Sequence, residues 1–203
     1  NIDVAAAVGS VFGIWHNSGP GPLHESSLLR PGNEQVAAAY VVYGTSTILV
    51  AATLGSVQGF TLDNASGEFL LTHPDLRYPE KCEYYSANVG NFAGWGEPVQ
   101  RAVTALQGQY TLRYIGSLVC DFHRNMLKGG IYLYTGDSTH VHGKLRLMYE
   151  ANPLAYIAEQ AGGAASTGAE RILDVQPQRL HQQTPLIVGS RDVVEDTLAT
   201  IDR

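Results

Sequence analysis

Residues 143–153 (GKLRLMYEANP) combine two cationic side chains and one carboxylate on an apolar background. Lys144, Arg146 and Glu150 stand at even spacing, so a strand would point all three toward one face. Ammonium and guanidinium groups bind phosphate oxygens, and a carboxylate binds a hard cation. The segment therefore predicts a combined phosphate and metal site.

The same segment predicts how these groups are positioned. The opposite row of the strand would be Leu145, Leu147 and Tyr149, which we expect in the core. Asn152 followed by Pro153 is typical of an N-cap with proline at the first helical position. We therefore expect a strand that delivers its polar face to the start of a helix.

The first third of the chain is rich in predicted strands, from residue 4 to about residue 71. Apolar, β-branched runs separated by turn residues predict two strand pairs, 36–43 with 47–54 and 57–62 with 68–72. Glycine, proline and serine are frequent in residues 17–33, which predicts an exposed loop.

From about residue 73 onward, predicted strands alternate with predicted helices. The expected helices are 98–106, 118–127, 154–160 and 193–201, and the expected strands are 109–114 and 131–134. Such alternation indicates a layered α/β/α arrangement. We therefore predict an α/β protein of two parts, a strand-rich domain over residues 1–73 and an α/β/α domain over residues 74–203.

Composition excludes some classes of function. The chain has 203 residues, a net charge of −6 and 44% hydrophobic residues. The negative charge argues against a general nucleic-acid binder, and no apolar run approaches the roughly 20 residues of a membrane span. Cys82 and Cys120 form neither a zinc set nor a disulfide framework, which favours a cytoplasmic location.

Several blocks, in order along nearly the whole chain, carry a resemblance to a known family. They are residues 8–14 (VGSVFGI), 85–88 (YSAN), 113–119 (RYIGSLV), 129–134 (GGIYLY), 143–153, 161–163 (AGG), 173–175 (LDV) and 188–190 (VGS). Together they resemble class I fructose-1,6-bisphosphatase, within the superfamily of lithium-sensitive, magnesium-dependent sugar phosphatases.

The resemblance implies an activity and residue roles. The activity is Mg²⁺-dependent hydrolysis of the 1-phosphate of fructose 1,6-bisphosphate to fructose 6-phosphate, in gluconeogenesis or Calvin-type carbon metabolism, with two or three Mg²⁺ ions. The matching positions are Asn88, Tyr114, Tyr134 and Lys144 for the 6-phosphate, Arg113 for a neighbouring subunit's 6-phosphate, Leu118 beside the sugar, Glu150 for the metal, and Arg146 near the metal and the 1-phosphate. Amide, phenol and ammonium groups can all donate hydrogen bonds to phosphate.

Each position also has a purely structural interpretation. Taken alone, Tyr134 would be a core residue, Asn88 a turn residue and Arg113 a solvated charge; their joint occurrence in family order favours the binding roles. His140 and His142, at i and i+2, could hold a metal, but a solvated loop is the better interpretation. For His123, a structural role on a helix is favoured over a catalytic one.

The chain departs from the family pattern at its start. Family members carry a metal motif of the form Asp-Pro-Leu-Asp-Gly-Ser-Ser-Asn-Ile-Asp, and this chain begins Asn1-Ile2-Asp3, as if inside it. Both ligand aspartates would then precede residue 1, so we expect the chain alone to have little or no activity. Asn91 replaces a phosphate-contacting tyrosine, and His16 replaces an arginine that contributes to AMP binding.

Two alternatives remain open from the sequence. One is a sedoheptulose-1,7-bisphosphatase of the same fold, because both sugars present two phosphates at similar spacing. The other is a non-catalytic chain, either a sugar-phosphate-binding chain or a regulatory one. In each case we expect a homo-oligomer, a dimer or tetramer, with no nucleic-acid or membrane partner.

Overall fold

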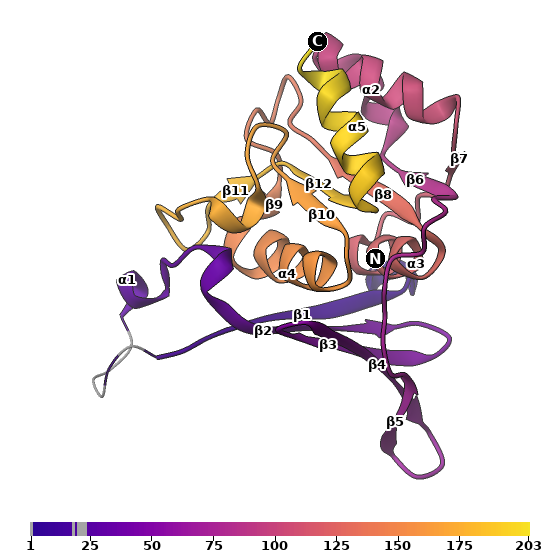
Figure 1. Cartoon of the computed structure of the whole chain (residues 1–203), viewed down its shortest axis with the longest axis vertical. Helices are drawn as coiled ribbons and strands as arrows, with labels where there is room; N and C mark the ends of the chain where they lie inside the picture. Colours follow the sequence, from indigo (N-terminus) through magenta and orange to yellow (C-terminus); the bar gives the residue numbers. More distant parts are fainter. Residues whose placement is uncertain (1, 18, 20–23) are drawn as a thin grey trace.

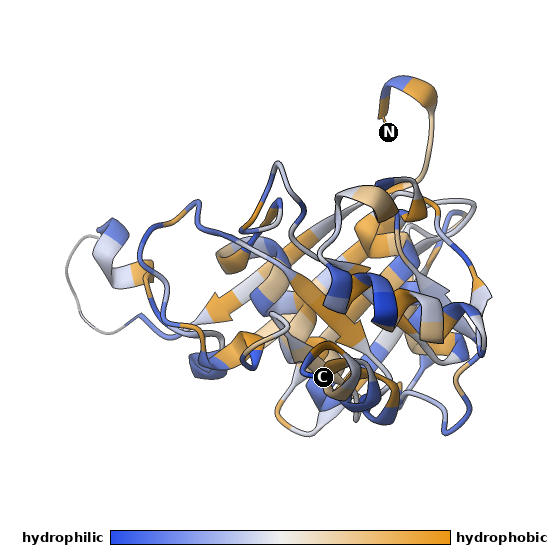
Figure 2. Ribbon diagram, turned by 90° about the horizontal axis from the view of Figure 1, so that it is seen from above, coloured by the Kyte–Doolittle hydropathy of each residue, from blue (hydrophilic) through white to orange (hydrophobic). Residues whose placement is uncertain are grey.

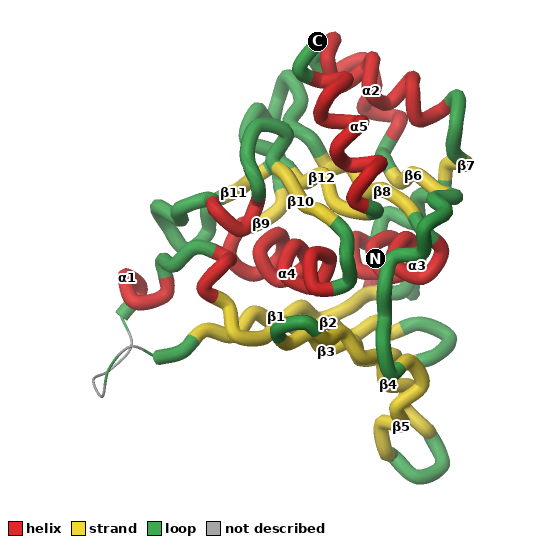
Figure 3. The backbone as a smooth tube through the Cα atoms, in the orientation of Figure 1, coloured by secondary structure: helices red, strands yellow, loops and turns green. Residues whose placement is uncertain are grey.

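The computed structural model describes residues 2–17, 19 and 24–203, which form four layers (Figures 1 and 3). A first sheet lies under two helices, α3 (Leu118–Lys128) and α4 (Asn152–Gln160). A second sheet covers these helices from the other side. On the far face of the second sheet lie α2 (Glu97–Gln107) and α5 (Arg191–Ile201).

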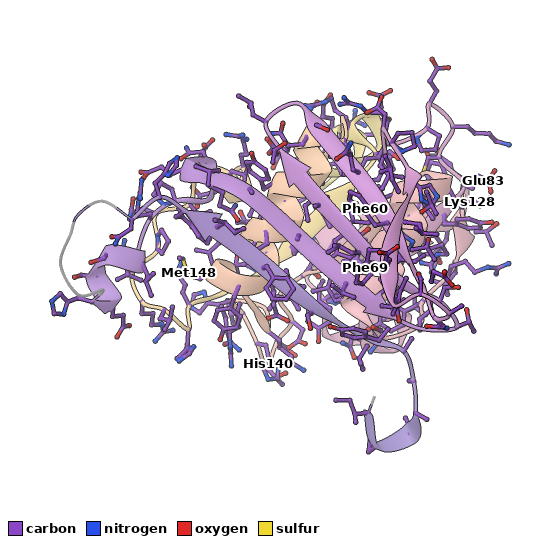
Figure 4. The ribbon with its side chains drawn as sticks, turned by 90° about the horizontal axis from the view of Figure 1, so that it is seen from below. Phe60, Phe69, Glu83, Lys128, His140 and Met148 are labelled. Carbon is purple, nitrogen blue, oxygen red and sulfur yellow. The ribbon has the colours of Figure 1, made fainter. Side chains whose placement is uncertain are left out.

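The first sheet is antiparallel, with its strands in the order of the sequence. They are β1 (Val8–Trp15), β2 (Gln35–Tyr43), β3 (Thr47–Thr53), β4 (Ser56–Asp63) and β5 (Glu68–His73). Both predicted strand pairs are confirmed. The inner face packs on α3 and α4 through side chains such as Tyr40, Val50 and Val57, all 0% exposed. The outer face is also apolar, and Figure 4 shows Phe60 and Phe69 on it.

The second sheet has the order β10-β12-β8-β6-β7. Its strands are β6 (Tyr84–Ser86), β7 (Thr111–Leu112), β8 (Gly130–Tyr134), β10 (Ala164–Ser166) and β12 (Leu186–Gly189). Strands β7, β6 and β8 run parallel, and β12 and β10 complete the sheet in antiparallel pairs. A separate pair joins β9 (Leu145–Arg146) to β11 (Gln183–Thr184).

Helix α4 lies between the two sheets and is apolar on nearly all sides, with Leu154, Ala155 and Ile157 each 0% exposed. A helix that is hydrophobic all round is buried on all sides. Figure 2 shows the apolar colouring concentrated in the interior layers. A second core forms where α2 and α5 meet the sheet, around Val103, Val194 and Ile187. The expected layering of helices on both faces of this sheet is confirmed.

Some local predictions were wrong. The strand expected over 109–114 is only β7, two residues long. Residues 17–33 are not all exposed loop, because they contain the short helix α1 (Glu25–Leu28) and part of a 3-10 turn (Gly32–Glu34) with a buried Gly32; residues 18 and 20–23 lie outside the described part. Over the residues that are described, no helix has the length and apolar character needed to cross a membrane.

Candidate functional site

A cavity of about 570 Å³ opens at the start of α3, beside β1 of the first sheet. Its lining includes Leu118, Arg146 and Glu150, together with residues of β1 and of the loop that enters α3. The structure thus brings together three of the predicted site residues, which come from two distant parts of the sequence. A guanidinium and a carboxylate facing one cavity can hold a phosphate and a cation.

The local conformation around Glu150 differs from the prediction. The strand ends at Arg146, and residues Leu147–Ala151 form a π-helical turn that continues directly into α4. Glu150 therefore does not reach Arg146 along a strand face. Instead the turn carries the carboxylate back over the end of the strand, where Glu150 Oε2 accepts a hydrogen bond from the backbone N–H of Arg146 over 2.6 Å.

Pro153 gives a physical reason for the widened turn. Proline has no N–H to donate to the carbonyl four residues before it, and its ring crowds that carbonyl. The N–H of Asn152 bonds to the carbonyl of Leu147, five residues back, as in a π-bulge. Asn152 is thus already helical, so the predicted N-cap is wrong. Tyr149, predicted in the core, is 38% exposed and hydrogen-bonds His181.

Three further predicted residues lie at or just beyond the carboxyl ends of neighbouring parallel strands. Ser86 pairs with Tyr132, and Tyr85 pairs with Leu112 and Ile131. Two residues past Ser86, Leu112 and Tyr132 stand Asn88, Tyr114 and Tyr134, at the same edge of the sheet. Asn88 is exposed and the two tyrosines are half-buried. Ligands of open α/β sheets bind outside the carboxyl ends of parallel strands.

Two cations lie at the borders of this region. Lys144 is exposed and directly precedes β9, after Gly143, which has a positive φ of 69°. Arg113 is exposed at the end of β7, and its guanidinium carbon lies 5.7 Å from the centroid of the Tyr84 ring. Neither of these two side chains contributes to the lining of the cavity beside Glu150.

Tyr114 at the sheet edge is held as a neutral hydrogen-bond donor. Burial raises the pKa of Tyr114, and the nearby Tyr134 and Asp121 raise it further. Tyr134 stacks on Tyr132 with ring centroids 6.4 Å apart, and burial raises the pKa of Tyr132 well above its ordinary value. A protonated phenol can donate to a phosphate oxygen, which a phenolate could not do.

The histidines considered from the sequence occupy two kinds of environment. His123 lies on α3, with its Nδ1 2.7 Å from the Tyr40 hydroxyl in the packing between α3 and the first sheet. His140 and His142 are exposed, in the loop between β8 and β9. In the described part of the chain, no three histidine, cysteine or acidic side chains gather closely enough to hold a metal.

Asp121 and Arg124, which no sequence pattern singled out, form a network beside Tyr114. Asp121 is 0% exposed, and Arg124 Nη2 lies 2.8 Å from its Oδ1. The available signal was an acidic residue in the first turn of a predicted helix, where the helix dipole favours negative charge.

Two family models match successive parts of the chain. Residues 1–74 match the family model of the fructose-1,6-bisphosphatase N-terminal domain, and residues 78–202 match that of the C-terminal domain. The chain is 51% identical over 205 residues to class 1 fructose-1,6-bisphosphatases of Synechococcus sp. strains JA-2-3B'a(2-13) and JA-3-3Ab, covering all of this chain and 62% of each relative.

Solved structures of fructose-1,6-bisphosphatase also match the chain. The crystal structure of Leishmania major fructose-1,6-bisphosphatase in holo form matches with a TM-score of 0.95 and 42% identity, over 100% of this chain and 65% of that one. The apo form matches with a TM-score of 0.94 and 42% identity, over 68% of its chain. The chain therefore spans less than two thirds of the length of its curated relatives.

Fold and site together define a layered α/β protein in which a sheet edge bearing amide and phenol groups accompanies a cavity lined by a guanidinium and a carboxylate. With both domain models matched along its length, the chain belongs to the fructose-1,6-bisphosphatase family.

Proposed function

We propose that this chain binds fructose 1,6-bisphosphate and contributes to hydrolysis of its 1-phosphate, which yields fructose 6-phosphate. The observation that carries the proposal is the alignment of Asn88, Tyr114 and Tyr134 at one sheet edge, next to the cavity with Arg146 and Glu150. The first group donates hydrogen bonds to the 6-phosphate, together with Lys144. Leu118, half-buried on the cavity wall, packs against the sugar.

Glu150 fits a role as a Mg²⁺ ligand. Its carboxylate is a hard oxygen donor on a cavity wall, and the backbone bond from Arg146 fixes one oxygen in place. Mg²⁺ would supply charge stabilisation and an acidified water for attack on phosphorus. Arg146 lies beside this position and would bind the 1-phosphate oxygens, lowering the free energy of the charge that develops during transfer.

Among the described residues that line this cavity, Glu150 is the single carboxylate. Catalytic Mg²⁺ sites need near-octahedral oxygen coordination, beyond what one protein carboxylate provides. We therefore infer that residues 1–203 bind sugar phosphate but hydrolyse it slowly or not at all without further carboxylates. A normal rate of Mg²⁺-dependent phosphate release from the purified chain would contradict this.

We further propose that the chain has two domains, residues 1–73 and 74–203. We also propose that it assembles into a dimer or tetramer in which Arg113 reaches a neighbour's 6-phosphate. The separate family matches support the first statement. The exposure of Arg113 at the end of β7 supports the second.

Isothermal titration with fructose 6-phosphate tests the binding role. Lys144→Met should weaken binding at least about tenfold, because a charge-assisted hydrogen bond contributes about 1.5–3 kcal/mol. Lys128→Met is the matched control, since it removes the same charge from an exposed position at the end of α3 (Figure 4). Equal loss in both variants, or no binding by the unmodified chain, would overturn the proposal. A parallel titration with sedoheptulose 7-phosphate compares the two sugar classes.

A further inference from the structure

The buried carboxylate of Asp121 holds the loop that enters α3. Both of its oxygens lie 3.0 Å from the N–H nitrogen of Ile115, and Oδ2 also accepts from Gly116 over 3.1 Å. Gly116 has φ +81°, in the left-handed region that glycine adopts readily. Asp121 therefore fixes the backbone direction of two consecutive residues.

Arg124 extends the same network to a neighbouring strand. Its Nη2 lies 2.8 Å from Asp121 Oδ1, so the buried negative charge is paired. The same nitrogen lies 2.9 Å from the carbonyl oxygen of Arg113 and 2.6 Å from the hydroxyl of Ser86. Asn125 Nδ2 donates to that hydroxyl over 3.0 Å. The network thus joins β6, the loop after β7 and α3.

Two of these segments lead to candidate phosphate-binding side chains, Tyr114 and Asn88. Tyr114 lies between two backbone positions that the network holds, the carbonyl of Arg113 and the N–H of Ile115. Asn88 lies two residues after Ser86, the last residue of β6. The orientation of the Tyr114 side chain therefore depends on groups that do not themselves face the sheet edge.

We propose that Asp121 is a positioning residue for the sugar-phosphate site, an inference that rests on the proposed function. Holding the backbone on both sides of Tyr114 orders the loop before the ligand arrives. Binding then loses less conformational entropy, and the phenol already points where it can donate. Arg124 takes part by pairing the charge and by holding Arg113.

The test is the affinity of the full chain for fructose 6-phosphate, measured by isothermal titration at a temperature where circular dichroism shows every variant folded. Asp121→Asn keeps the side-chain shape and removes the charge. The new amide NH₂ group must face either the N–H groups of the loop or Arg124, and neither of these can accept a hydrogen bond from it. We expect affinity to fall at least tenfold. Val193→Ala, in the separate core beneath α5, is the matched control; it should lower the melting temperature and keep affinity within twofold.

A double-mutant cycle separates positioning from general stability. Tyr114→Phe should weaken binding in the unmodified chain and add little in the Asp121→Asn background, because the phenol is already misplaced there. Fully additive losses would overturn the proposal, since Asp121 would then act independently of Tyr114.

The remaining outcomes are also decisive. If the unmodified chain binds no fructose 6-phosphate, the proposed function fails together with this inference. If the unmodified chain binds and Asp121→Asn binds equally well, the inference alone fails. If Asp121→Asn does not fold, Gly116→Ala replaces it, because alanine at that φ moves the same N–H away from the carboxylate. The same tenfold loss is then expected, and retained affinity would overturn the proposal.

Discussion

The backbone N–H of Arg146 donates a hydrogen bond to Glu150 Oε2 over 2.6 Å, across the point where strand gives way to helix. This bond sets the place of the carboxylate relative to the guanidinium beside the cavity. It also satisfies a partly buried backbone donor, so Glu150 has a structural role in addition to the proposed metal-binding role.

Replacing Glu150 should separate these two roles. Glu150→Ala removes the acceptor and should lower the free energy of unfolding by about 1–2 kcal/mol. Glu150→Gln retains a carbonyl acceptor of the same length and should cost less than about 0.5 kcal/mol. Urea denaturation followed by tryptophan fluorescence measures both. Equal losses in the two variants would show that charge, and not the hydrogen bond, stabilises the turn.

Tyr134 provides a test at the other end of the proposed site. Tyr134→Phe keeps the ring that stacks on Tyr132, so the melting temperature should stay unchanged. The affinity for fructose 6-phosphate should fall about fivefold, because a hydrogen bond contributes about 1 kcal/mol. Tyr110→Phe, beside a different cavity under α2 and α5, is the control and should bind normally. Unchanged affinity in Tyr134→Phe would remove this phenol from the site.

The sequence was most informative where one pattern persisted over many residues. The β-branched runs over 36–43 and 47–54 and the helical pattern over 193–201 predicted β2, β3 and α5 close to their observed bounds. Strands such as β6 and β10 have only three residues, too few for a periodic signal, and they form because neighbouring strands and helices bury them.

The site shows the same limit. Lys144, Arg146 and Glu150 were selected by spacing, yet Glu150 meets Arg146 through a π-helical turn that alternation could not predict. The Asp121 network depends on contacts between α3 and β6, which are distant in sequence, so an acidic residue in the first helical turn could be noticed but its partners could not be predicted.

Two glycines with similar backbone conformations test how tightly the backbone next to Lys144 packs against β11. Gly143 and Gly55 have φ of +69° and +75°, but a Cβ on Gly143 would lie 2.7 Å from the Thr184 carbonyl oxygen, whereas one on Gly55 meets open space. Gly55→Ala should lower the free energy of unfolding by only the conformational penalty of a positive φ, about 1 kcal/mol. Gly143→Ala should lower the free energy of unfolding by at least about 2 kcal/mol more, since β9 must move away from β11 to make room for the Cβ. Urea denaturation measures the difference, and similar costs would show that this strand pair adjusts freely.

His123 should make stability depend on pH. Burial, and secondarily the nearby His73, lowers the pKa of His123 from 6.5 to about 4. The unfolded chain therefore binds a proton at higher pH than the folded chain does. The contribution of His123 to the free energy of unfolding is complete above pH 6.5. It decreases as the pH falls from 6.5 toward 4 and is lost below that. The linkage predicts a loss of about 2 kcal/mol between pH 8 and pH 5.

His123→Gln should remove most of this dependence. The variant will be less stable than the unmodified chain at pH 8, because the close packing and hydrogen bond with Tyr40 change. Between pH 8 and pH 5, however, its free energy of unfolding should fall by about 2 kcal/mol less. His140→Gln, in the exposed loop after β8, is the control and should follow the unmodified chain. If His123→Gln shows the same pH slope as the unmodified chain, His123 is not the group that couples protonation to unfolding.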